Sequence, residues 1–271
     1  MTQTISPHFS TSSPPALTMA GHLDPQSARH SQARQTHQIL HVHRGVSLLV
    51  DECRKQPILA GLTAFIPAGW PHRFTVLGAG VDYKALSLSP GLFTASVSGI
   101  VIFRASALEQ NLLDRIVIHD QADLHGLTQD CLNLLLKLIP KTLNIPASIV
   151  RLPLPSTPLT REIVSFIESS HARPLGMDDF TAAFPYSARH LTRLFREDLG
   201  LTMFEYLRLY RILMASIALG DESRSITQCA LDAGYEGQSS FDHDFREIYG
   251  VAPKVFRQRI MGTEADSRDE A

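Results

Sequence analysis

One stretch of this chain occurs twice, fifty positions apart, and it constrains the fold more than any other feature. The first copy runs from Ser187 to Gly200 and the second from Gly237 to Gly250. Large apolar residues recur at every fourth position: Leu191, Phe195 and Leu199 in the first copy, Phe241, Phe245 and Tyr249 in the second. This spacing predicts two helices with one buried face each, both ended by glycine. A second short helical pattern precedes each copy, so the repeat predicts two helix-turn-helix units.

Composition describes an ordinary two-domain protein rather than a general nucleic-acid binder. The 271 residues are 44% hydrophobic and 19% charged, and the net charge is −2. Non-specific binding to phosphates requires clustered Lys and Arg, so DNA contact would need a local basic patch. The three cysteines are isolated, no basic signal-peptide start is present, and no apolar run could span a membrane. We therefore expect a cytoplasmic protein with reduced thiols and no membrane partner.

The first half of the chain predicts a β-rich domain behind a polar tail. Residues 1–27 are rich in Ser, Thr and Pro, which favours a flexible tail. Residues 28–95 contain short β-like runs separated by Gly, Pro or charged residues, which predicts a small barrel. Residues 96–148 carry apolar residues at helical spacing. This helical extension could pack on the barrel or form a dimer seam.

The second half predicts a linker, a helical domain and a charged end. Residues 149–158 contain three prolines, which favours a stiff, extended linker. Residues 159–260 combine helical apolar spacing with an N-cap at Ser187 and capping-box patterns at Thr202–Glu205 and Ser225–Gln228. Residues 261–271 are acidic and predict a solvated tail. The predicted fold is α+β with two domains: an N-terminal β-barrel with a helical extension and a C-terminal all-α double helix-turn-helix.

One motif in the barrel region resembles a known family. The segment Gly61-Leu-Thr-Ala-Phe-Ile-Pro67-Ala-Gly69-Trp70-Pro-His72 resembles the second motif of cupins, which reads Gly, five residues, Pro-x-Gly, two residues and His. The resemblance implies a cupin-like barrel, and Trp70 lies at its pocket-forming turn.

Three histidines of this region could together bind a metal ion. His41 and His43 share a face of a strand, and His72 would add a third imidazole, a set suited to zinc or iron. The first cupin motif, however, requires a Glu four or five residues after its second His. Ser47 and Leu48 occupy these positions in this chain. We therefore expect no metal, no other cofactor and no catalytic residue. The candidates for an effector pocket are His41, His43, Trp70 and His72.

Residues 159–260 resemble the AraC-type transcription regulators through a long, ordered series of matches. The matching segments are Leu191-Thr-Arg193-Leu-Phe195-Arg196, Gly200, Tyr206-Leu-Arg-Leu-Tyr-Arg211-Ile212, Ala230-Leu-Asp-Ala-Gly234-Tyr235, Ser239-Ser-Phe241, Phe245-Arg246 and Tyr249-Gly-Val-Ala-Pro253. The resemblance implies two recognition helices in successive major grooves of double-stranded DNA, held about one DNA turn (~34 Å) apart by residues 203–219. It also implies a small-molecule effector acting on the barrel, a homodimer and, for an activator, contact with RNA polymerase.

The side of each copy opposite its apolar face carries the candidate DNA contacts. Arginine can bind guanine edges through two hydrogen bonds or pair with phosphate. In the first copy we predict base contacts from Arg189, Thr192 and Arg193 and a phosphate contact from Arg196. In the second copy the corresponding candidates are Gln238, Ser239 and His243 for bases and Arg246 for phosphate.

The second copy differs in charge from the first. His243 stands between Asp242 and Asp244, and carboxylates near phosphates repel, so we expect the second helix to bind DNA more weakly. Two other functions stay open at this point. A metal-dependent cupin enzyme would contain stoichiometric metal. A protein-interaction regulator that has lost DNA affinity would lack the steep salt dependence of a DNA binder.

Overall fold

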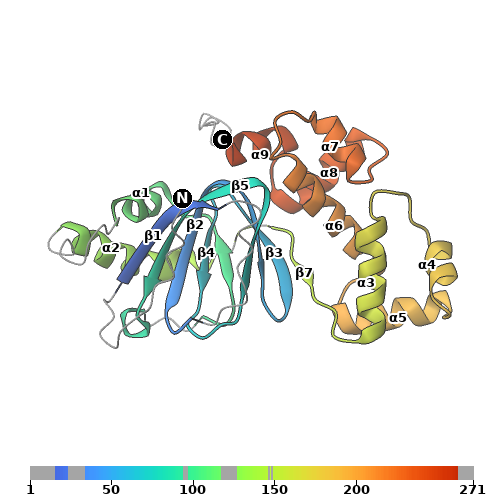
Figure 1. Cartoon of the computed structure of the whole chain (residues 1–271), viewed down its shortest axis with the longest axis horizontal. Coiled ribbons are helices and arrows are strands. Elements are labelled where there is room, and N and C mark those ends of the chain that lie inside the picture. Colours follow the sequence, from blue (N-terminus) through green and yellow to red (C-terminus); the bar gives the residue numbers. More distant parts are fainter. Residues whose placement is uncertain are drawn as a thin grey trace, which may run out of the picture.

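A computed structural model describes residues 16–23, 34–93, 97–116, 127–145, 147 and 149–261. These residues form a sheet domain followed by a helical domain, with β7 between them (Figure 1). The strands are β1 Ala16–Leu23, β2 His37–Val50, β3 Arg54–Leu59, β4 Thr63–Ile66, β5 Arg73–Leu88, β6 Val101–Phe103 and β7 Leu152–Pro153.

The strands of the described residues build one antiparallel sheet around two long central strands. Its order is β1-β5-β2-β3-β7, while β4 pairs with β2 and with β6. The short runs predicted from the sequence merge, because glycines read as strand ends are bends within β2 and β5. Gly45 has a φ of +87°, and a Cβ there would lie 2.1 Å from the Gly80 carbonyl oxygen. Only glycine fits such a close crossing of two strands.

Three segments differ from the sequence-based expectations. Residues 16–23, predicted as tail, form β1 and pair with β5 from Leu88 to Val81, which supplies that strand with a hydrogen-bonded neighbour. Residues 101–103, predicted as helical, form β6, because Ile102 and Phe103 are fully buried and an apolar run fits a strand with two covered faces. Within the linker, β7 pairs with β3. The tail residues 1–15, 24–27 and 262–271 lie outside the described residues.

The helical extension covers the face of the sheet that lies away from the helical domain (Figure 1). It contains α1 Ala107–Arg115 and α2 Leu127–Thr142. Leu112 of α1 and Leu135 and Ile139 of α2 pack in one buried cluster with Phe65 and Leu86 of the sheet. The structure therefore shows the packing on the sheet, and the dimer seam stays a prediction.

The helical domain follows the predicted pattern of caps and apolar faces. Its helices are α3 Pro158–Ser170, α4 Met177–Ala183, α5 Ala188–Leu199, α6 Met203–Ala218, α7 Ile226–Asp232, α8 Gln238–Tyr249 and α9 Pro253–Ile260. Ser187, Thr202 and Ser225 cap α5, α6 and α7 by accepting a backbone N–H three residues on. Glu205 completes a capping box at Thr202. Within the described part of the chain, no helix is long and apolar enough to cross a membrane.

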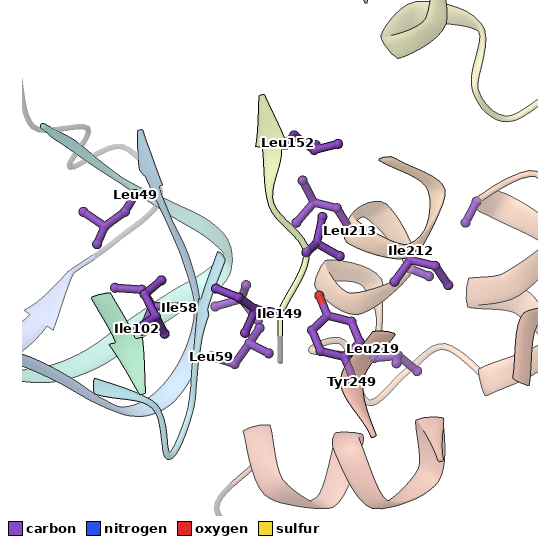
Figure 2. Packing of buried hydrophobic residues seen from close by; sticks show 14 of the residues in the cluster. Leu49, Ile58, Leu59, Ile102, Ile149, Leu152, Ile212, Leu213, Leu219 and Tyr249 are labelled. Atoms are coloured by element: carbon purple, nitrogen blue, oxygen red, sulfur yellow. The ribbon is translucent and has the colours of Figure 1, made fainter. Parts of the chain in front are cut away.

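The two domains share one apolar core. A single cluster of buried side chains extends from the sheet, across the segment before α3, to the far helices. Figure 2 shows Ile149 and Leu152 on this segment, between Leu59 of the sheet and Leu213 of α6. Tyr249, at the end of α8, also reaches this contact. The sheet domain is therefore packed against the helical domain rather than tethered to it.

Candidate nucleic-acid interface

The two copies of the repeat form helices with the same pattern of burial, position by position, over 191–200 and 241–250. The apolar residues of both face the core, and each helix ends at a left-handed glycine, with a φ of +69° at Gly200 and +72° at Gly250. The amide of each glycine closes the helix by donating to the arginine carbonyl four residues earlier. The predicted repeat of α5 and α8 is thus confirmed, with α4 and α7 as their partner helices.

The outer face of α5 is basic. Arg189, Arg193 and Arg196 are exposed, and Thr192 is half-buried beside them. Arg193 Nη1 donates to both carboxylate oxygens of Glu197 at 2.8 Å. Because both side chains are more than half exposed, this ion pair contributes little and can be exchanged for a nucleic-acid acceptor at small cost.

The outer face of α8 carries the second set of predicted contacts. Gln238, Ser239, His243 and Arg246 are all exposed. His243 Nε2 lies 3.9 Å from a carboxylate oxygen of Glu247, which repeats the placement of the Arg193–Glu197 pair one unit later. The structure therefore brings the predicted contacts of each copy onto one face of its own helix.

The acidic residues of α8 are not equivalent. Asp244 is only 17% exposed and points to the body of the domain, where Tyr235 donates its hydroxyl proton at 2.9 Å. Arg208 of α6 lies 3.8 Å from Asp244 and 2.7 Å from Glu247. Arg208 thus supplies a countercharge to Asp244, and the weaker binding of α8 to DNA stays a prediction. Asp242 occupies the place of Thr192 in the repeat.

Asp198 of α5 holds the linker, and the sequence-based prediction missed it. Its Oδ2 accepts the backbone N–H groups of Ser156 at 3.1 Å and Thr157 at 3.2 Å. The hydroxyls of Ser156 and Thr160 also donate to this carboxylate. The repeat held a signal for this role, because the second copy has Ile248 at the same position. A charge present in only one of two otherwise matching copies points to a contact that only one copy makes.

Replacing Asp198 with asparagine is expected to lower the free energy of unfolding by about 1–2 kcal/mol, because an amide cannot accept all four hydrogen bonds. Burial alone would raise the pKa of Asp198, but the hydrogen bonds from Ser156, Thr160 and Thr157 outweigh it and hold the pKa below its ordinary value. A lowered carboxyl pKa adds stability above the unfolded pKa of about 3.9 and loses it as the pH falls through the folded pKa.

Urea unfolding of wild type and Asp198→Asn at pH 7 and at pH 3 measures this contribution. The difference between the two proteins should shrink at the lower pH, where the wild-type carboxyl takes up a proton. The exposed Asp178→Asn serves as the control. A difference that is equal at both pH values would contradict the role of the carboxylate.

The four residues predicted for an effector pocket form two separate pairs. His41 is buried, shares a 2.8 Å hydrogen bond through Nδ1 with the Thr63 hydroxyl, and lies against His43 with ring centroids 4.6 Å apart. Burial is the main cause that lowers the pKa of His41 to about 4. His72 instead bonds through Nδ1 to the Trp70 carbonyl at 2.9 Å.

No group of potential metal ligands in the described part of the chain joins these two pairs. Among the described residues, the group of three potential ligands within reach of one cation is His243, Asp244 and Glu247. Arg208 already pairs with both of those carboxylates. The effector pocket at the histidines and Trp70 stays a prediction.

A cavity of about 310 Å³ lies between the two domains, in a place that the sequence did not predict. We call it the interdomain cavity. Its sheet-domain side and its helical-domain side each contribute apolar residues and one arginine, Arg104 and Arg259. The apolar lining includes Leu59, Leu62, Ile145, Tyr249, Val251, Phe256 and Ile260. The Tyr249 hydroxyl is buried without a hydrogen-bond partner of ordinary geometry, and burial raises its pKa.

Comparison with known proteins agrees with this geometry. A family model described as a helix-turn-helix domain matches residues 180–259. The regulatory protein SoxS of Salmonella typhimurium is 30% identical over 102 residues, which are 38% of this chain and 95% of SoxS. The transcriptional activator AarP of Providencia stuartii is 31% identical over 101 residues, 37% of this chain and 75% of AarP. The transcriptional regulator YkgA of Escherichia coli is 27% identical over 101 residues, and the match covers 42% of YkgA.

Two helix-turn-helix units joined by one long helix, with arginines on the open face of α5, define a DNA-binding regulator of transcription. The chain belongs to the AraC-type family of helix-turn-helix transcription regulators.

Proposed function

We propose that this regulator reads two successive major-groove segments of one DNA duplex, α5 in the first and α8 in the second. The observation that carries this proposal is the equal burial of the two helices, which leaves the corresponding face of each open. Arg189, Thr192 and Arg193 contact base edges and Arg196 a phosphate. In the second unit Gln238, Ser239 and His243 contact bases and Arg246 a phosphate.

Selection of bound duplexes from a random DNA pool tests the proposal. Two recognition helices should enrich a site with two conserved half-sites whose centres lie about 10 base pairs apart. Affinity for this operator should fall steeply with salt, because phosphate contacts release counterions. A pool that shows no enriched motif after repeated rounds contradicts the proposal and favours a protein-interaction regulator.

We propose the interdomain cavity as the site of a small-molecule effector. Its volume suits a small ligand, its walls are mostly apolar, and Arg104 and Arg259 bring positive charge to both sides. An apolar molecule with one carboxylate fits this lining best, because arginine pairs with carboxylates through two hydrogen bonds. The histidines and Trp70 of the sheet domain are the second candidate for this site.

Filling the interdomain cavity should abolish effector binding. A thermal-shift screen with aliphatic and aromatic carboxylates identifies ligands, since a ligand at 100 times its Kd stabilises the fold by about 2.7 kcal/mol. Val251→Trp adds volume to the lining and should remove the shift while DNA binding is retained. Leu231→Trp, on the exposed side of α7, should leave the shift unchanged. If Val251→Trp still shows the full ligand-induced thermal shift, the effector binds outside the interdomain cavity.

We further propose a homodimer formed through α2. Leu134 of α2 is exposed, and Cys131 and Leu138, at helical spacing from it, are only partly buried at the border of the cluster that packs α2 on the sheet. Leu134 is 41% exposed, and contact with a second copy of α2 would remove this apolar surface from water. Sedimentation equilibrium of the full chain measures its mass in solution. A monomer at micromolar concentration contradicts the homodimer.

We also propose that this regulator acts in the cytoplasm on chromosomal DNA and has no catalytic activity of its own. AarP is named an activator, and a similar role here includes contact with RNA polymerase. Transcription from a promoter that contains the selected operator, with and without the regulator, tells activation from repression.

A further inference from the structure

The sheet domain contacts the first helix-turn-helix unit through a small polar cluster. Lys55 of β3 donates from Nζ to Glu168 Oε1 of α3 at 2.8 Å. The hydroxyl of Tyr206, a fully buried residue of α6, donates to the same oxygen at 2.9 Å. Lys55 and Glu168 are each about three-quarters buried, so solvent screens their pairing less than on an open surface. We call Lys55, Glu168 and Tyr206 the polar anchor.

The linker adds a second attachment to the same unit. On its sheet side, Leu152 and Pro153 pair with β3, and the Leu154 N–H donates to the Cys53 carbonyl at 2.8 Å. On its helical side, Asp198 of α5 accepts from Ser156 and Thr157. The chain between β7 and α3 is therefore fixed at both ends, and the position of α5 is tied to the edge of the sheet.

The second helix-turn-helix unit contacts the sheet domain through apolar residues. Leu59 and Leu62 of the sheet side face Tyr249, Phe256 and Ile260 across the interdomain cavity, and all five are buried in the shared core. We call these residues the apolar seam. Tyr249 is the last residue of α8, so the seam reaches the end of the second recognition helix itself.

Neither contact covers the outer faces of the recognition helices, since Arg189, Arg193 and His243 are exposed in the packed molecule. The sheet domain is thus placed to hold the helices, not to block them. We propose that the sheet domain acts as a brace between the two helix-turn-helix units, with the polar anchor fixing the first unit and the apolar seam the second. This inference rests on the proposed function, because it concerns simultaneous reading of two half-sites.

A brace affects only DNA that engages both helices. Two linked contacts gain affinity from the high effective concentration of the second site once the first is bound, and this gain depends on their relative orientation. Loosening one unit reduces the gain without changing the contacts that either helix makes alone. A ligand in the interdomain cavity would act on the apolar seam and leave the polar anchor in place.

Two anchor variants with opposite changes of charge test the brace on the selected operator. Lys55→Met removes a positive charge and keeps an apolar side chain of similar length. Glu168→Gln removes a negative charge and keeps an oxygen that can accept from Tyr206. Each full-length variant is measured by fluorescence anisotropy against three duplexes: the intact operator, one with the first half-site scrambled and one with the second scrambled.

Both variants should bind the intact operator roughly five- to tenfold more weakly. Both should bind each scrambled duplex within about twofold of wild type, because one helix alone does not use the brace. The matched controls are the exposed Lys141→Met and Glu162→Gln, which should leave the intact-to-scrambled affinity ratio at its wild-type value.

Three results would overturn the brace. An unchanged ratio for both anchor variants shows that the polar anchor does not orient the first unit. Opposite changes of similar size on all three duplexes show a plain charge effect on DNA affinity. Equal losses on all three duplexes together with a lowered Tm show general destabilisation. If no operator can be selected at all, the proposed function fails first and the brace fails with it.

Discussion

Replacing Gly234 with alanine should lower the free energy of unfolding by about 3 kcal/mol or more. Gly234 forms the turn of the second helix-turn-helix unit with a φ of +91°. A Cβ at this position would lie 2.3 Å from the His171 carbonyl oxygen and 3.1 Å from the Ala172 Cα. Both neighbours are backbone atoms at the end of α3, so the turn has to move away from the first unit.

The His171 carbonyl has little freedom to give way. Arg211 of α6 donates from Nε to it at 2.9 Å and from Nη2 to the Arg173 carbonyl, also at 2.9 Å. The guanidinium thus joins α3 to α6 at the point where the second unit packs against them. Gly234→Ala therefore strains the turn and disturbs the contact between the two units together.

Gly250→Ala separates these two effects. Gly250 has a φ of +72°, but no atom lies within 4 Å of its ideal Cβ position. The free energy of unfolding of this variant should fall by about 1–2 kcal/mol, the cost of the left-handed backbone conformation for a residue with a Cβ. Urea unfolding followed by circular dichroism gives both free energies. Equal losses in the two variants would show that the close approach to His171 is relieved without cost.

Replacing Arg193 with alanine should weaken binding to the selected operator by about 1–3 kcal/mol, roughly ten- to a hundredfold. Arg193 lies in the middle of the exposed face of α5, and its guanidinium pairs with Glu197. On DNA the exposed pair is exchanged for a base edge. The loss should be concentrated at one or two base positions, where the variant no longer prefers the wild-type base.

Two other arginines show whether this effect is specific. Arg196→Ala should weaken binding to all sequences alike and reduce the salt slope by about one, as expected for a phosphate contact. Arg115→Ala, at the exposed end of α1, should bind as wild type does. A uniform loss with Arg193→Ala, with no change in base preference, would assign Arg193 to a phosphate instead.

The helical domain could be predicted from the sequence because its determinants are local. Apolar spacing of four residues, a capping serine or threonine and a closing glycine specify each recognition helix within about fifteen residues of chain. The predicted N-caps Ser187, Thr202 and Ser225 are confirmed. At Ser225 the predicted capping box is only half formed, since Gln228 donates to Asp232 instead.

The sheet and the contacts between domains could not be predicted in the same way, because their partners are distant in sequence. The local pattern at Gly45 is that of a strand end, because its crossing with Gly80 depends on a residue that is distant in sequence. Lys55 and Glu168 are 113 positions apart, and no local pattern marks either as a partner. Arg208 shows the same limit, since its countercharges lie on α8. The sequence of the acidic second copy therefore does not reveal the cation that pairs with Asp244 and Glu247.

Base-interference footprinting of the selected operator tests the central claim most directly. Reading by two recognition helices predicts two groups of essential bases about 10 base pairs apart on one face of the duplex. Arg193→Ala should remove the interference signal in one group alone, and His243→Ala should remove it in the other group alone. A single group of essential bases, or loss of the same group in both variants, would contradict reading by two recognition helices.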